Sequence, residues 1–141
     1  MTLTLDHART IVRTTLDTGR AMKLKPLSVI VLDAGGNVKA FEREDGASPG
    51  RYQIAHGKAY GAVMLGMPGS AQMARAESQA YFIAAVNGAF GGALIPVPGG
   101  VLVKDAAGAV IGAVGVTGDT SDNDAAAAKA GIEAAGLMAV I

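Results

Sequence analysis

Residues 27–43 have the sequence LSVIVLDAGGNVKAFER, and this stretch sets the fold class of the chain. Leu27–Leu32 is rich in β-branched residues and leucine, which is typical of a buried strand. Asp33–Asn37 contains two glycines, and glycine supplies the positive φ angles of a tight turn. Val38–Arg43 then alternates apolar and polar side chains, which predicts a second strand antiparallel to the first.

A second hairpin is predicted further along the chain. Val101–Lys104 and Ala109–Thr117 are apolar runs, and the turn between them, Asp105–Gly108, places Gly108 in a left-handed conformation. Apolar residues at helical spacing predict helices around both hairpins, with Thr4 as the N-cap of the first. The predicted helices cover residues 5–23, 49–67, 71–78, 80–87 and 122–138. The N-caps expected for the later helices are Ser48, Ser70, and Ser121 or Asp122.

This order of elements predicts an α+β fold. Adjacent hairpins make an antiparallel sheet, and long helices must cover its faces, which gives three layers. A chain of 141 residues is expected to form one domain over residues 1–141.

Composition excludes several classes of function. The 12 basic and 12 acidic residues give no basic excess that would attract nucleic acid. The chain has no cysteine, which removes disulfides, thiolate metal sites and cysteine nucleophiles. Its longest apolar run, Ala109–Thr117, is too short to span a bilayer, and Met1–Arg9 lacks the apolar core of a secretion signal. We therefore expect a cytoplasmic protein that binds neither nucleic acid nor membrane.

Tyr52, His56 and Tyr60 are four residues apart and share one side of a predicted helix. An imidazole between two phenol rings can ligate haem iron, so His56 is a candidate metal ligand and the tyrosines candidate porphyrin contacts. The alternative is a surface or subunit-interface stripe. His7, the other histidine, is expected to face solvent.

A second candidate site joins the end of a strand to the next helix. Arg43 and Asp45 end the second strand, and Lys58 lies on the helix that follows. Arg43 and Lys58 can bind a carboxylate or a haem propionate, and Asp45 can accept a proton or orient the lysine. The alternative is an ion-pair network that fixes the turn.

Two further patterns have competing explanations. Gly99 and Gly100 follow Pro98, and their backbone N–H groups can face an anion, although turn formation alone also explains them. The carboxylates of Asp119, Asp122 and Asp124 resemble a site for a hard cation, but helix capping explains them better.

Several segments, in order along almost the whole chain, resemble motifs of the GlcG/HbpS family (DUF336). Arg43–Ala47 is similar to an R-x-D-G-A motif, and Lys58-Ala59 to a helical lysine–alanine pair. The other segments that resemble the family are Pro26–Gly36, Pro96–Val101, Ile111–Gly118, Asp122–Asp124 and Ala128–Ile132.

The resemblance implies a profilin-like α/β/α sandwich with a five-stranded antiparallel sheet, a homo-oligomer from dimer upward, and the binding or degradation of haem. The first hypothesis is therefore a protein that binds haem or a related tetrapyrrole. A second is a cofactor-independent enzyme, in which Arg43 and Lys58 hold a small oxo- or hydroxy-acid while Asp45 or His56 moves a proton. A third is a purely structural homo-oligomer.

Overall fold

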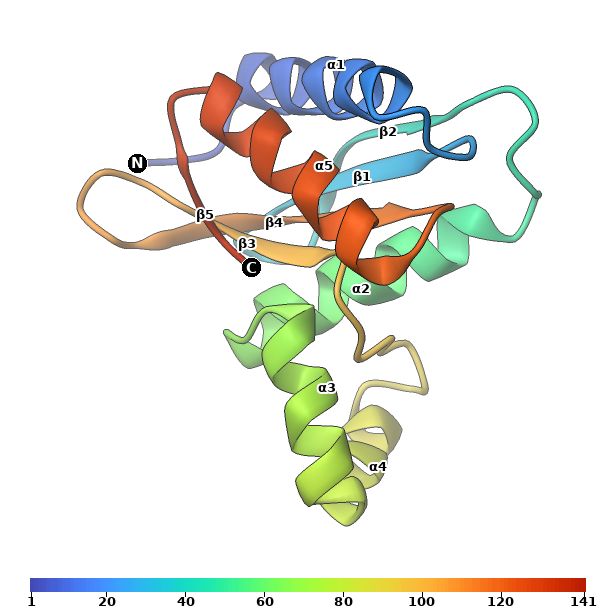
Figure 1. Cartoon of the computed structure of the whole chain (residues 1–141). Coiled ribbons are helices and arrows are strands. Elements are labelled where there is room, and N and C mark those ends of the chain that lie inside the picture. Colours follow the sequence, from blue (N-terminus) through green and yellow to red (C-terminus); the bar gives the residue numbers. More distant parts are fainter.

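The computed structural model describes all 141 residues as five helices around one five-stranded antiparallel sheet (Figure 1). The strand order in the sheet is β2-β1-β4-β3-β5. The helices are α1 (Leu5–Ala21), α2 (Arg51–Leu65), α3 (Gly69–Ser78), α4 (Ala80–Ala89) and α5 (Ser121–Ala134). The strands are β1 (Ser28–Asp33), β2 (Val38–Arg43), β3 (Gly100–Lys104), β4 (Val110–Thr117) and β5 (Met138–Val140). The predicted α+β fold is confirmed.

Both predicted hairpins are present. β1 pairs with β2 with Ser28 opposite Arg43, and β3 pairs with β4 with Gly100 opposite Gly115. The two hairpins join through β1 and β4, which are also antiparallel. β1 is therefore an inner, buried strand, whereas β2 is an edge strand.

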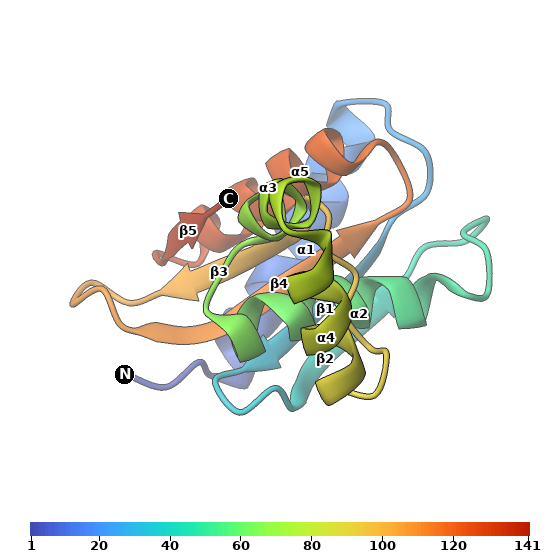
Figure 2. The same cartoon turned by 90° about the horizontal axis from the view of Figure 1, so that it is seen from below.

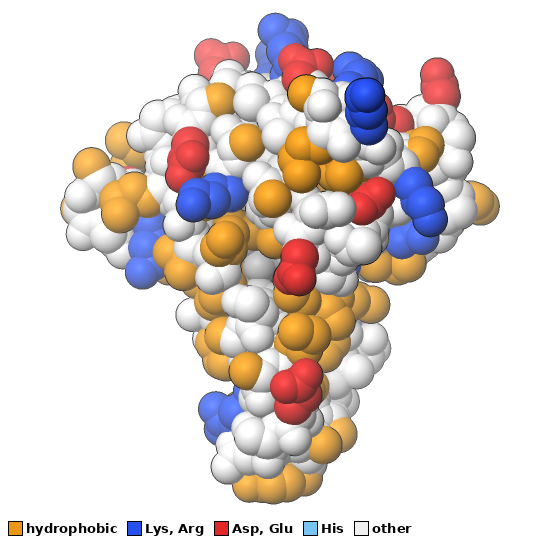
Figure 3. Space-filling model, viewed as in Figure 1, with side chains coloured by type: hydrophobic (Ala, Val, Ile, Leu, Met, Phe, Trp, Pro, Cys, Tyr) orange, Lys and Arg blue, Asp and Glu red, His pale blue; other side chains and the backbone are white.

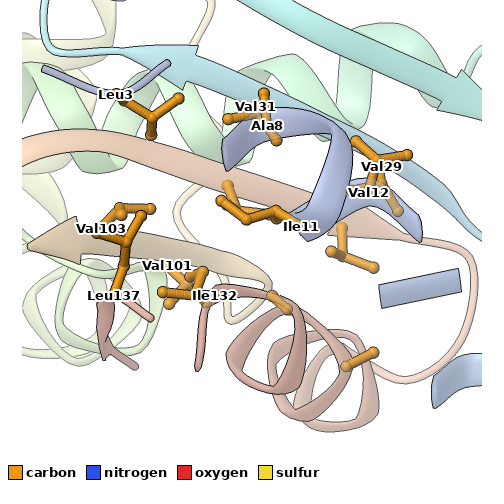
Figure 4. Packing of buried hydrophobic residues seen from close by; sticks show 14 of the residues in the cluster. Leu3, Ala8, Ile11, Val12, Val29, Val31, Val101, Val103, Ile132 and Leu137 are labelled. Carbon is orange, nitrogen blue, oxygen red and sulfur yellow. The ribbon is translucent and has the colours of Figure 1, made fainter. Parts of the chain in front are cut away.

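Helices cover both faces of the sheet. α1 and α5 lie together over one face, and α2 lies on the other (Figure 1). Ile11 of α1, Val31 of β1 and Ile132 of α5 belong to the larger apolar core beneath α1 and α5 (Figure 4). The smaller core joins the alanines on the inner side of α2 to the sheet. α3 and α4 form a helical hairpin that projects away from the sheet on the α2 side (Figures 1 and 2).

α2 approaches the sheet closely because β4 carries glycine beneath it. A Cβ atom added at Gly115 would overlap the carbonyl oxygen of Ala55. We expect Gly115→Ala to lower the free energy of unfolding by about 1–3 kcal/mol, since backbone must move to make room. Gly50→Ala is the control, because nothing lies within 4 Å of the added atom. Urea denaturation measures both, and equal stability of the two variants would contradict this account of the packing.

The end of the chain differs from the prediction. α5 ends at Ala134, whereas the helical spacing predicted a helix to Met138. Gly136 has a left-handed φ of 76°, which commonly ends a helix. The residues after it form β5, which extends the sheet beside β3 with Val140 opposite Leu102. Only the family resemblance implied this fifth strand.

The N-cap of α1 is confirmed, and that of α5 is shifted by one residue. The Thr4 hydroxyl accepts a hydrogen bond from the His7 backbone N–H at 3.1 Å. His7 Nδ1 accepts one from the Thr4 N–H at 3.2 Å, so His7 completes a capping box. Thr120 caps α5 in place of Ser121 or Asp122, because its hydroxyl accepts a hydrogen bond from the third helical N–H.

The other two predicted caps are wrong. α2 begins at Arg51, after a turn at residues 49–50, and Ser48 instead accepts a hydrogen bond from the Arg51 side chain at 3.2 Å. α3 begins at Gly69, so Ser70 lies inside that helix. None of the five helices combines the length and apolar character that crossing a bilayer requires.

Candidate functional site

α2 brings the predicted aromatic stripe together. The ring centroids of Tyr52 and His56 are 6.0 Å apart with an interplanar angle of 23°. Those of His56 and Tyr60 are 5.2 Å apart at 19°. The imidazole is therefore stacked between two phenol rings, as the four-residue spacing predicted.

Two phenylalanines from other elements extend the stripe. Phe41 of β2 meets Tyr52 edge-on at 4.9 Å, and Phe90, just after α4, meets Tyr60 edge-on at 6.0 Å. We call Phe41, Tyr52, His56, Tyr60 and Phe90 the aromatic column. Sequence analysis missed both phenylalanines. The alternation along β2 gave a signal for Phe41, but the position of Phe90 depends on the path of the α3–α4 hairpin.

His56 has the chemistry of a free iron ligand. Its side chain is partly exposed and makes no hydrogen bond within the chain, so neither ring nitrogen is occupied by a protein partner. A neutral imidazole nitrogen is a common ligand of haem iron, and flat aromatic side chains suit contact with a porphyrin. The donor group and its aromatic neighbours therefore fit a haem.

Lys58 is held inside the protein rather than at a ligand pocket. Only 3% of its surface is exposed. Its ammonium donates hydrogen bonds to the Val116 carbonyl at 3.0 Å and to Asp124 Oδ2 at 3.2 Å. The second Asp124 oxygen accepts a hydrogen bond from the Asp119 N–H at 3.0 Å. The buried ion pair thus ties α2 to the start of α5.

Opposing effects act on the pKa of each partner in this ion pair. Burial lowers the pKa of Lys58, because it penalises the ammonium, and the Asp124 carboxylate works against that shift. Burial raises the pKa of Asp124, and the Lys58 ammonium works against it. Each charge therefore depends on the other to remain ionised away from water.

The predicted meeting of Arg43, Asp45 and Lys58 is wrong. Lys58 is two residues after His56, which places it about 200° around the helix, on the side that faces the sheet. Arg43 is exposed and donates to the Ala47 carbonyl at 2.7 Å, and Asp45 is exposed without an ion-pair partner. Lys58 instead pairs with Asp124, which is 66 residues further along the sequence, so local spacing could not predict this pair.

A residue that sequence analysis passed over fixes the turn after β2. One oxygen of Glu44 accepts a hydrogen bond from the Leu27 N–H at 2.7 Å, and the other pairs with Arg20 at 3.0 Å. The ion pair expected at this turn is therefore present with different partners.

Arg43 shares a face of β2 with Phe41, because alternate residues of a strand lie on one side. It thus lies near the Tyr52 end of the aromatic column.

Gly99 and Gly100 enclose Lys58. A Cβ atom at Gly100 would overlap the Lys58 carbonyl oxygen, and one at Gly99 would lie 2.9 Å from the Lys58 ammonium. Gly99 also has a φ of 110°, which favours glycine. Close packing therefore accounts for both glycines.

Two of the three aspartates near α5, Asp119 and Asp124, accept hydrogen bonds, and the three do not form a metal site. No group of three or more His, Asp or Glu side chains in the structure is arranged to hold a metal ion. Asp119 accepts hydrogen bonds from the Asn123 side chain at 2.8 Å and from the N–H groups of Lys25 at 3.0 Å and Thr120 at 2.8 Å. These donors lower the pKa of Asp119 to about 2.

We expect Asp119→Ala to lower stability only where this carboxylate is ionised. A carboxyl group whose pKa is lower in the folded state stabilises that state fully at a pH above its unfolded pKa of 3.8. This stabilisation is lost as pH falls through the folded pKa of about 2. The gap between the urea midpoints of wild type and variant should therefore narrow across this range. A gap independent of pH would contradict this role of Asp119.

Comparison with known proteins finds a matching family and solved structures with the same fold. A family model described as "Haem degrading protein HbpS-like" matches residues 3–133. The chain is similar to the crystal structure of HbpS, with 29% identity, a TM-score of 0.82, and coverage of 94% of this chain and 89% of HbpS. No curated protein matches the sequence.

Two other crystal structures share the fold. PduOC, solved as a complex with heme, has 20% identity and a TM-score of 0.84 over 95% of both chains. The DUF336 protein ORFY of Klebsiella pneumoniae has 24% identity and a TM-score of 0.82 over 94% of this chain and 90% of its own.

Proposed function

The chain belongs to the HbpS-like family of haem-degrading proteins, and from this premise we propose that it binds haem on the aromatic column. The observation that carries the proposal is His56, an imidazole that is stacked between Tyr52 and Tyr60 and has no hydrogen-bond partner in the chain. The neighbour PduOC, which was crystallised with heme, supports the same class of ligand for this fold.

Each residue of the proposed site has a distinct task. His56 would ligate the iron, and Tyr52 and Tyr60 would contact the porphyrin on either side of it. Arg43, near the Tyr52 end, would pair with a propionate through its planar guanidinium. Bound haem would supply a redox-active iron centre, and the protein would set its ligand and its exposure.

The other candidate site residues fit the proposal less directly. Gly99 and Gly100 make room for Lys58, and Lys58 is buried in its ion pair with Asp124, so its ammonium is not free to bind a ligand. The enzymatic alternative needs Arg43 and Lys58 on one substrate carboxylate, and these two side chains lie apart. A homo-oligomeric state and a cytoplasmic location complete the proposal.

A hemin titration tests the proposed function. We expect wild type to shift the Soret band of hemin to saturation. We expect Arg43→Gln to bind about tenfold more weakly, because a hydrogen bond to a charged group is worth roughly 1.5 kcal/mol or more. Lys129→Gln is the control, since Lys129 is an exposed cation that pairs with Glu133 on α5. No Soret shift at stoichiometric hemin would refute haem binding, and equal affinity of the two variants would refute the role of Arg43 alone.

A further inference from the structure

β2 leaves one edge of the sheet open, because it pairs only with β1. The Glu44 N–H, one residue beyond β2, donates to the Leu27 carbonyl on the β1 side. Successive residues of a strand direct their N–H and C=O groups to opposite sides, so those of Phe41 and Arg43 are directed away from β1. No turn, loop or helix forms a backbone hydrogen bond with these two residues. Such an edge can accept an added strand.

A groove between α1 and β2 follows this open edge. Its first part, about 410 Å³, is lined by residues along α1 and by Ala40–Glu42. Its second part, about 520 Å³, is lined by the end of α1 and by residues 42–45. Leu16, Arg20 and Glu42 line both parts, which therefore form one groove. β2 spans about 20 Å and α1 about 25 Å, so a strand of about six residues fits beside them.

Two arginines of α1 line this groove without a partner. Arg9 and Arg13 are exposed, and neither forms an ion pair or a hydrogen bond within the chain. Asp17, which also lines the groove, pairs with Arg20 at 3.3 Å. Like charges four residues apart on a helix repel each other, and carboxylates bound between them would offset that repulsion. Figure 3 shows charged side chains gathered over α1, whereas hydrophobic side chains cover much of the projecting α3–α4 hairpin.

The floor of the groove is apolar. It is lined by Val12 and Leu16 of α1 and by Ala40 of β2. Alternate residues of a strand share one side, so an added strand would place every second side chain towards this floor and the arginines above it. Main-chain hydrogen bonds to an open edge supply affinity in this mode of binding, and contacts of alternate side chains supply specificity. The groove therefore suits an extended segment that carries apolar and acidic residues on one side.

A second copy of β2 does not suit this edge. In an antiparallel pair about a twofold axis, the outward groups of Phe41 and Arg43 must face those of the same residues in the second copy. Each such register places like charges opposite one another, namely Lys39 with Arg43, Glu42 with Glu42, or Arg43 with Arg43. Like charges directly opposite destabilise a strand pair. The occupant that fits is therefore a segment of a different protein.

We propose that the α1–β2 groove binds an extended acidic segment of another protein, which adds a strand beside β2 and pairs its carboxylates with Arg9 and Arg13. The main chain of that segment bonds to the outward N–H and C=O groups of Phe41 and Arg43. It uses only the backbone of these two residues, since their side chains lie on the α2 side of the sheet. The inference is thus independent of haem binding on the aromatic column.

Selection from a random displayed peptide library, on the full chain without hemin, tests this groove. We expect the selected peptides to be rich in Asp and Glu and to place apolar residues at every second position. A labelled synthetic copy of a selected peptide, followed by fluorescence anisotropy, should bind Arg9→Gln/Arg13→Gln more weakly by about tenfold or more, because hydrogen bonds to charged groups are lost. Lys23→Gln/Lys129→Gln removes as much charge from exposed sites outside the groove and should bind like wild type.

Hydrogen exchange measured by NMR on the same peptide complex locates the added strand. The amide protons of Phe41 and Arg43 should exchange more slowly than in the free protein, whereas that of Glu42, which is directed to β1, should change little. Failure to select any peptide, equal affinity of wild type and Arg9→Gln/Arg13→Gln, or unchanged exchange at Phe41 and Arg43 would overturn the proposal. Protection of these two amides in a dimer of the free protein would assign the edge to a second copy instead.

Discussion

Lys58→Met is expected to lower the free energy of unfolding by about 3–5 kcal/mol, because it leaves the Asp124 carboxylate buried without its cation. Replacing both partners, in Lys58→Met/Asp124→Leu, should recover most of this loss, since no unpaired charge then remains inside. Urea denaturation near neutral pH measures all three proteins. Lys129→Met is the matched control, because its exposed pair with Glu133 is expected to contribute less than about 1 kcal/mol.

The pH dependence of Lys58→Met gives a second check on the same ion pair. Without Lys58, only the hydrogen bond from the Asp119 N–H opposes the effect of burial, which raises the pKa of Asp124. A carboxyl group whose pKa is higher in the folded than in the unfolded state binds its proton on folding, so folding is favoured as pH falls towards that pKa. The decrease in the free energy of unfolding caused by Lys58→Met should therefore be smaller in mild acid than at neutral pH. A loss no larger than that of Lys129→Met would contradict the structural role of the pair.

His56→Ala is expected to weaken hemin binding by about 100-fold or more. It removes the proposed iron ligand itself, and even the outer partners of metal ligands are commonly worth 10–100-fold in affinity. Because His56 makes no hydrogen bond within the chain, its removal should leave the fold intact. Hemin titration followed at the Soret band, with a melting curve of the apoprotein, separates the two effects.

His7→Gln is the matched control for this experiment. His7 is the only other histidine, and it completes the capping box at Thr4. Glutamine can fill the same position in a capping box, so this variant should keep both its stability and its affinity for hemin. Weak hemin binding by His7→Gln together with normal binding by His56→Ala would reassign the ligand.

The sequence predicts the local features of this fold well. Leu27–Leu32 and the glycines after it indicated the first hairpin, and the four-residue spacing from Tyr52 to Tyr60 placed three rings on one side of α2. β5 escaped local analysis because a three-residue strand has no periodicity to detect. Its position depends on the open edge of β3.

The partner of Lys58 could not be predicted from the sequence, because the two residues are far apart along the chain. The residues three before and four after it, Ala55 and Ala62, are buried on the inner side of α2, so its burial was open to prediction. Its partner Asp124 is 66 residues away and meets it only because α5 starts beside the end of β4. The R-x-D-G-A resemblance instead directed attention to Asp45, a nearer carboxylate that the structure leaves exposed.

Chemical rescue of His56→Ala by free imidazole tests the central claim most directly. If His56 ligates the iron, added imidazole should restore the Soret spectrum of wild type to the hemin complex of His56→Ala, and it should leave the wild-type complex unchanged. If the His56→Ala complex already has the wild-type spectrum before imidazole is added, haem iron is held elsewhere and the aromatic column is not its site.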